Sequence, residues 1–250
     1  MKWTRWFAAS SAALAATAVL AAAAPAYADT IAWTKWTSAT PSNDAAHTPG
    51  SATGTVSTDL YGTITVTYSG QNLGLLTNYP SWGPTSTFTG GEVGNPPPAA
   101  NNALKIVGGQ TYTETITFSQ PVADPIFAIW SLGSPIVPAY FDFNEPFNVL
   151  GGGRSNEYGG TGLVDAAPNI FGHEGNGIIQ FIGTYTTISF TTPDYENYYA
   201  LTFGENDTLT SQIPNPPPNP SPVPEPSTFV LLATGALGSM GMLRRRFFAR

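Results

Sequence analysis

The sequence predicts an all-β protein whose main body is an antiparallel β-sandwich of the jelly-roll or Greek-key type. Three observations support this fold class. Apolar residues alternate with threonine or serine at a period of two, no segment of the body repeats apolar residues at a helical spacing over three turns, and glycine-rich turns separate the apolar segments. The chain contains no cysteine, so its core and not disulfide bonds must stabilise this body.

The predicted strands are of two kinds. The alternating segments are 60–68, 111–118, 187–191 and 199–203. Threonine suits the solvated face of a half-buried strand, whereas the continuously apolar segments 126–130 and 178–182 predict strands that are buried on both faces. Glycine-rich turns are expected at 69–70, 90–91, 108–109, 151–153, 159–160 and 175–177.

Residues 1–28 read as a secretory signal peptide. Two cations precede an apolar run at 7–24, and Ala26 and Ala28 form a small-x-small cleavage site. We therefore expect signal peptidase to cut after Ala28. A buried alanine-rich helix is the alternative interpretation.

Residues 29–212 are predicted to form one ectodomain, followed by a proline-rich linker at 213–226 and an apolar segment at 227–250. Eight prolines between Pro214 and Pro226 exclude helix and central strand from the linker, because proline has no backbone N–H donor. The linker is expected to be a semi-rigid polyproline spacer.

The last segment is predicted to be a single transmembrane helix with a cytoplasmic arginine-rich tail. It is uncharged from Phe229 to Leu243 and is followed by Arg244, Arg245 and Arg246. Fifteen helical residues span roughly 22 Å, so flanking residues and snorkelling arginines must help to cross a hydrocarbon core of about 30 Å. Cations near an apolar segment tend to remain cytoplasmic.

The distribution of charged residues along the chain fits an exported protein, because most cations lie near the two ends and the acids lie between them. Only Lys35, Lys105 and Arg154 lie among the sixteen acids between Asp29 and Glu225, which leaves a net charge of −13 there. A strongly acidic body without a basic stripe argues against nucleic-acid binding.

The C-terminal region resembles a known sorting signal. Residues 223–228, the apolar span and the arginine cluster occur in the order of a PEP-CTERM signal, and the resemblance covers 223–250. It implies recognition of Pro224, Glu225 and Pro226 by exosortase, a membrane-embedded enzyme of Gram-negative bacteria that make exopolysaccharide, with cleavage near these residues. A plain tail anchor that is never processed is the alternative. Segments 118–133 and 172–183 are similar to β-rich ectodomains that precede such tails in environmental bacteria. This resemblance implies the architecture and the setting of the ectodomain and implies no particular activity.

Candidate catalytic residues are few. His173 and Glu174 form an adjacent pair in a glycine-rich segment, and His47 lies in a polar segment that is expected to be solvated. A tight turn is the simpler interpretation of the pair. The sequence contains no nucleophile elbow, zinc-protease motif, P-loop or dinucleotide fingerprint. We therefore predict that the protein is not an enzyme.

Calcium is the only cofactor with some support. Asp142, Asn144 and Glu145 offer hard oxygen donors close together, and extracellular calcium is abundant enough to fill weak sites. Solvated surface acids are the default interpretation, so the sequence predicts no cofactor and names calcium as the one candidate.

Exposed aromatic residues could stack on sugar rings. The candidates are Trp33, Trp36 and Trp82, and a tyrosine cluster of Tyr195, Tyr198 and Tyr199. The preferred interpretation is that they belong to the core or to strand edges, and Trp130, inside an apolar run, is expected in the core.

Three functions follow in decreasing order of support. The first is a non-catalytic protein that is exported, anchored in the inner membrane in transit, and sorted to the cell surface or the extracellular matrix, where it associates with polysaccharide. The second is a lectin-like glycan-binding module. The third is a secreted hydrolase that uses His173 and Glu174 or a pair of carboxylates.

Overall fold

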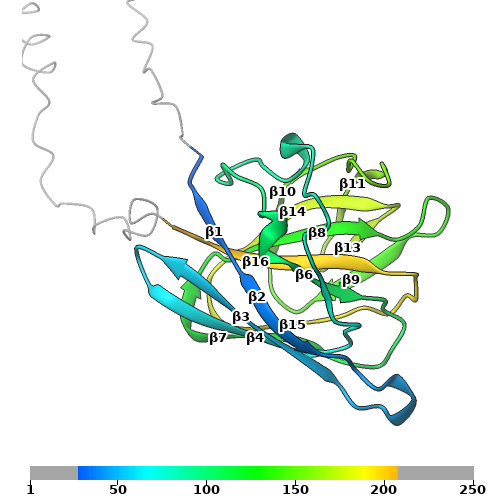
Figure 1. Cartoon of the computed structure of the whole chain (residues 1–250). Coiled ribbons are helices and arrows are strands. Elements are labelled where there is room, and N and C mark those ends of the chain that lie inside the picture. The colour runs from blue at the N-terminus through cyan, green and yellow to red at the C-terminus, as the bar shows by residue number, and fades with distance from the viewer. Residues whose placement is uncertain (1–27, 208–250) are drawn as a thin grey trace, which may run out of the picture. The chain divides into compact units, whose positions relative to one another are not determined.

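Two eight-stranded β-sheets form the body of residues 28–207, the part of the chain that the structure, a computed structural model, describes (Figure 1). The predicted β-sandwich is confirmed. The predicted signal peptide up to residue 27, the linker and the transmembrane segment lie outside the described residues. Between residues 28 and 207, no helix is long and apolar enough to cross a membrane.

The first sheet has the strand order β10-β14-β8-β16-β6-β5, with β1 paired to β16 and β11 paired to β14. Its strands are β1 (Ile31–Trp33), β5 (Leu75–Leu76), β6 (Ala103–Ile106), β8 (Ile126–Leu132), β10 (Phe147–Gly152), β11 (Thr161–Gly162), β14 (Gly175–Phe181) and β16 (Tyr199–Asn206). All neighbours are antiparallel except β11 and β14. In β1 and β16, Ile31 pairs with Asn206, so the two ends of the described body lie side by side.

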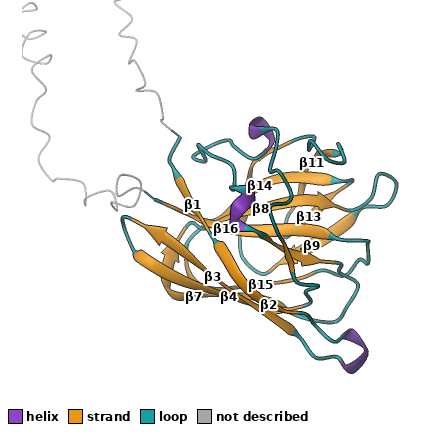
Figure 2. Cartoon of the chain, in the orientation of Figure 1, coloured by secondary structure: helices purple, strands orange, loops and turns teal. Residues whose placement is uncertain are grey.

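The second sheet has the order β12-β13-β9-β15-β7-β4-β3-β2 and is antiparallel throughout. Its strands are β2 (Lys35–Thr40), β3 (Gly50–Thr58), β4 (Gly62–Gly70), β7 (Glu114–Ala123), β9 (Ala139–Phe143), β12 (Val164–Ala166), β13 (Asn169–Gly172) and β15 (Thr184–Thr191). Three single-turn 3₁₀ helices interrupt the loops: η1 (Asp44–Ala46), η2 (Thr85–Thr87) and η3 (Ala99–Asn101) (Figure 2).

The main core lies between the two sheets. In β4 the predicted alternation is confirmed, because Ile64, Val66 and Tyr68 are buried while the threonines between them are exposed. Phe127 of β8 lies at the centre of an aromatic cluster. Its ring centroid is 4.4 to 6.1 Å from those of Phe141, Phe143, Phe181, Phe190 and Phe203.

A second core covers the outer face of the first sheet. The long connection 77–102 contributes Trp82, Phe88 and Val93, which pack with Trp130 and other residues of the sheet. All seven residues of β8 are therefore buried, as the continuous apolar run predicted. The prediction that 199–203 forms a strand with one solvent-exposed face is wrong. All eight residues of β16 are buried, because the second core covers the outer face of this strand as well.

The prediction of a turn at 175–177 is also wrong. These residues begin β14, with a register shift between Gly175 and Gly177 where they pair with β8. Glycine is needed here for space and not for a turn, since a Cβ on Gly177 would lie 2.3 Å from the carbonyl oxygen of Gly151 in β10. Gly151 and Gly152, expected in a turn, likewise belong to a strand.

Candidate functional site

The three tryptophans proposed as sugar platforms are buried. Trp33, Trp36 and Trp82 are only 5%, 1% and 1% exposed. The Trp36 Nε1–H donates to Thr202 Oγ1 at 3.1 Å, and Trp82 packs edge-on against Phe88. The core interpretation is confirmed for these three residues and their proposed role in sugar binding is corrected, because the two cores, one on each face of the first sheet, take up the ring faces that a sugar would need.

The residues proposed as calcium ligands occupy the end of β9 and the turn after it. Asp142 lies within the strand, where it pairs with Asn169 and Thr191, while Asn144 and Glu145 follow it. Over residues 28–207, no group of three or more His, Asp or Glu side chains is placed to hold a metal ion. The structure thus adds no support for a calcium site.

His173 and Glu174 form the turn between β13 and β14, as the simpler interpretation predicted. Glu174 has a positive φ of 52°, and its carboxylate accepts a hydrogen bond from the Ser131 hydroxyl of β8. The His173 ring instead packs edge-on against Phe171. Glu174, unlike His173, lines a cavity.

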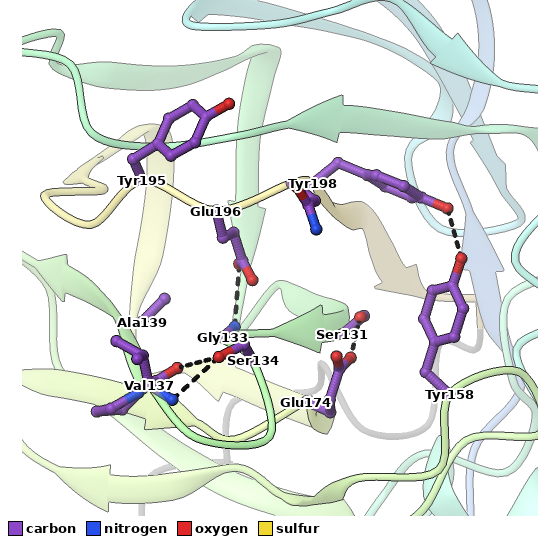
Figure 3. A pocket seen from close by; sticks show the side chains of 12 residues that line it. Ser131, Gly133, Ser134, Val137, Ala139, Tyr158, Glu174, Tyr195, Glu196 and Tyr198 are labelled. Atoms are coloured by element: carbon purple, nitrogen blue, oxygen red, sulfur yellow. Dashed lines mark hydrogen bonds between the residues drawn. The ribbon is translucent and has the colours of Figure 1, made fainter.

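This cavity, of about 550 Å³, is formed where four connections meet (Figure 3). They are the loops 133–138, 153–160 and 192–198 and the turn at 173–174. The side chains with functional groups at its wall are Ser131, Ser134, Tyr158, Glu174, Tyr195, Glu196, Asn197 and Tyr198. No Lys, Arg or His is among the twelve residues that line it. Its volume lies in the usual range for small-molecule sites.

One buried amide holds this wall together. Asn176, at the start of β14, accepts a hydrogen bond from the backbone N–H of Ser131 at 2.9 Å. Its Nδ2 donates to the carbonyl oxygens of Glu174 at 2.6 Å and Gly159 at 3.0 Å. Asn176 therefore fixes β8, the 173–174 turn and the 153–160 loop relative to one another, and this explains why a polar residue is fully buried there.

Glu196 is a partly buried acid in the wall of the cavity. Its Oε1 accepts a hydrogen bond from the Gly133 N–H at 3.0 Å. Burial raises the pKa of Glu196 to about 7, the Gly133 N–H opposes that rise, and the negative charges of Glu174 and Asp194 add to it. The cavity thus contains two carboxylates that repel one another.

Aromatic rings form the adjoining rim. The hydroxyls of Tyr158 and Tyr198 are 3.0 Å apart and hydrogen-bonded, and both rings pack against Trp130. The Lys105 ammonium lies 4.4 Å from the ring centroid of Tyr198. Tyr195 is 75% exposed.

The sequence identified part of this site. The tyrosine cluster at 195–199 predicts Tyr195 and Tyr198, although Tyr199 is buried in β16. Glu196 lies within the same segment, and its position between two of these tyrosines is the signal in the sequence that points to it. Tyr158 and Ser131 come from distant segments, and no pattern in the sequence places them here.

Comparison with known families identifies the chain's C-terminal region. The model of the PEP-CTERM protein-sorting motif matches residues 222–246, which include Pro224, Glu225 and Pro226 as well as Arg244 to Arg246. The chain carries a PEP-CTERM sorting motif. The motif supports an exported protein that a membrane-associated exosortase sorts to the cell surface. It lies outside the described residues, so its structure is not part of the site above. No curated protein and no solved structure matched the chain.

Proposed function

We propose that the protein is a non-catalytic component of the surface or extracellular matrix of a Gram-negative bacterium, associated with exopolysaccharide. The PEP-CTERM motif at 222–246 is the observation that carries this proposal. The acidic body adds support, because its net charge of −12 over residues 28–207 keeps it soluble and apart from anionic partners such as nucleic acid.

The test is replacement of Pro224, Glu225 and Pro226 by alanine in the native host, followed by fractionation of the cells. We expect the variant to be retained in the membrane fraction while the wild type reaches the surface or the medium. The matched control replaces Pro216, Pro217 and Pro218 by alanine, which removes three prolines of the same segment and leaves the motif intact. Identical location of all three proteins would contradict the proposal.

Intact-mass measurement separates a processed signal from a plain tail anchor. We expect the mature protein to lack residues 1–28 and the part of the chain that follows the PEP tripeptide. A mature chain that still ends at Arg250 would show a permanent anchor instead.

A second candidate function is glycoside hydrolysis. It is favoured by the two carboxylates in one cavity, one of which has a pKa raised towards neutrality, as a general acid requires. Release of reducing sugar from oligosaccharides by the wild type, lost in both Glu174→Gln and Glu196→Gln, would establish this activity. Intact oligosaccharides after prolonged incubation would favour the non-catalytic function.

A further inference from the structure

The cavity described above is open to a ligand from outside the protein. Tyr195 and Tyr158 are 75% and 52% exposed, whereas the tryptophans of the sandwich are buried. The cavity adjoins the start of β16 at Tyr199, and the described chain leaves the body at the other end of the same strand. An eight-residue strand is about 25 Å long, so the cavity is well separated from the point where the segment leading to the sorting motif begins.

The wall offers an unusual balance of groups. The amide of Asn197 can donate and accept hydrogen bonds, the bonded hydroxyls of Tyr158 and Tyr198 keep acceptor capacity, and Tyr195 presents an exposed ring. The Ser134 hydroxyl is already bonded to the backbone of Val137. Figure 3 shows the Glu196 side chain directed at Gly133 and the Glu174 side chain directed at Ser131, so two different segments bring a carboxylate to the wall of the cavity. Exposed aromatic rings together with convergent polar groups suit a ligand that is apolar on its faces and rich in hydroxyls at its edges, as a pyranose is.

The charges restrict the ligand further. Within the described residues, Glu196 uses Oε1 to bind Gly133 and Glu174 uses Oε2 to bind Ser131, so the hydrogen bonds of the protein engage one oxygen of each carboxylate. No cation lines the cavity, and the nearby Lys105 ammonium lies on the ring of Tyr198. A ligand ammonium would relieve the repulsion between the two carboxylates, whereas an acidic sugar would add to it.

We propose that this cavity binds an amino sugar with a free, positively charged amine, as a unit of an extracellular polysaccharide. The ammonium binds between Glu174 and Glu196, and the sugar ring packs on Tyr195. This inference deepens the proposed function and rests on it, because export is what brings the body into contact with polysaccharide.

The test measures binding of chitosan hexasaccharide to the purified full-length protein in detergent by isothermal titration calorimetry. Chitin hexasaccharide is the matched probe, since acetylation removes the charge and keeps the ring. We expect the chitosan probe to bind at least tenfold more tightly. Equal affinities, or no binding of chitosan hexasaccharide, would overturn the proposal.

Three variants assign the binding to this cavity. Glu174→Gln and Glu196→Gln retain the carbonyl acceptors for Ser131 and Gly133 but remove the charge, so each should weaken chitosan binding about tenfold. Tyr195→Ala should weaken both probes. Asp59→Asn, which removes an exposed charge elsewhere on the surface, should leave the affinity unchanged.

Near-ultraviolet circular dichroism of each variant verifies that the fold is intact. Unchanged affinity in folded Glu174→Gln and Glu196→Gln proteins would overturn the assignment, as would an equal loss of affinity in Asp59→Asn. The measurement also separates this inference from the proposed function. Correct sorting without chitosan binding would refute only the inference, and chitosan binding by a chain that is not sorted would refute only the proposed function.

Discussion

Glu196 Oε1 accepts a hydrogen bond from the Gly133 N–H at 3.0 Å, and this contact joins the loop before β16 to the loop after β8. The two strands are neighbours in the first sheet, so a bond between their loops sets the width of the cavity at the end of that sheet. The same carboxylate is both a structural acceptor and a group that a ligand can reach. Buried acids of this kind also make the stability of the fold depend on pH.

We predict that the free energy of unfolding decreases as the pH rises from about 4.5 to 8. Burial raises the pKa of Glu114 and Glu196 to about 7, and burial together with the charge of Asp124 raises the pKa of Glu205 to about 8. Over this range the folded state holds protons that the unfolded state has released, so stability is fully present below pH 4.5 and is lost as these groups ionise.

Glu205→Gln tests this directly. The amide cannot ionise, so the variant should be more stable than the wild type at pH 8 by a few kcal/mol and close to it at pH 4.5. Urea unfolding at both pH values measures the difference, with Asp59→Asn as the exposed control. The same pH dependence in Glu205→Gln as in the wild type would contradict the assignment.

We predict that Phe127→Ala destabilises the sandwich by about 3–5 kcal/mol. The ring of Phe127 is fully buried and contacts aromatic residues from both sheets, so its removal leaves a cavity where the sheets meet. Ile136→Ala, at a side chain that is 86% exposed, should cost less than about 0.5 kcal/mol. Chemical denaturation compares the two, and similar costs would disprove the central position of Phe127.

We predict that Gly177→Ala costs about 2–3 kcal/mol, because the added Cβ would lie 2.3 Å from a carbonyl oxygen of the neighbouring strand β10. Gly62→Ala is the comparison. Gly62 has a φ of 68° and open space around it, so only backbone strain of about 1 kcal/mol is expected there. Thermal unfolding midpoints rank the two, and a smaller loss at Gly177 would show that β10 and β14 can separate without penalty.

We predict that Asn176→Ala loosens the wall of the cavity. Its removal leaves the Ser131 N–H and the Glu174 carbonyl oxygen without this partner, at about 1–3 kcal/mol for a buried group left unpaired. The Gly159 carbonyl oxygen keeps its second donor, the Ser155 N–H at 2.7 Å. Hydrogen exchange of the Ser131 amide should become faster. Asn148→Ala, an exposed asparagine of β10, is the control and should leave that amide protected.

The sequence predicted the fold where local patterns follow burial. The alternation in β4 and the apolar run in β8 both reflect which faces of a strand are covered, and burial follows the pattern in each. The prediction of burial failed where a segment distant in the sequence covers a strand. The connection 77–102 covers the outer face of the first sheet, and this tertiary contact buries Trp82 and Trp33 and leaves β16 buried on both faces, although the strand contains polar residues.

The site was harder to predict than the fold for the same reason. The tyrosines at 195 and 198 stand out in the sequence, but Tyr158 and Ser131 reach the cavity through strand pairing between segments far apart in the chain. Gly175 and Gly177 illustrate the ambiguity at single residues. A glycine can be required because φ is positive in a turn, or because a neighbouring strand leaves no room for a Cβ. A short glycine-rich segment of sequence does not distinguish these two reasons.

The pairing of Ile31 with Asn206 has a mechanical consequence. The chain that continues towards the sorting motif leaves the body from β16, which is held by β8, β6 and β1. Antiparallel hydrogen bonds run perpendicular to the strand, so a pull along β16 loads many of them at once in shear and does not unzip them singly. A protein tethered through this end would therefore pass the drag of flowing water to three neighbouring strands at once.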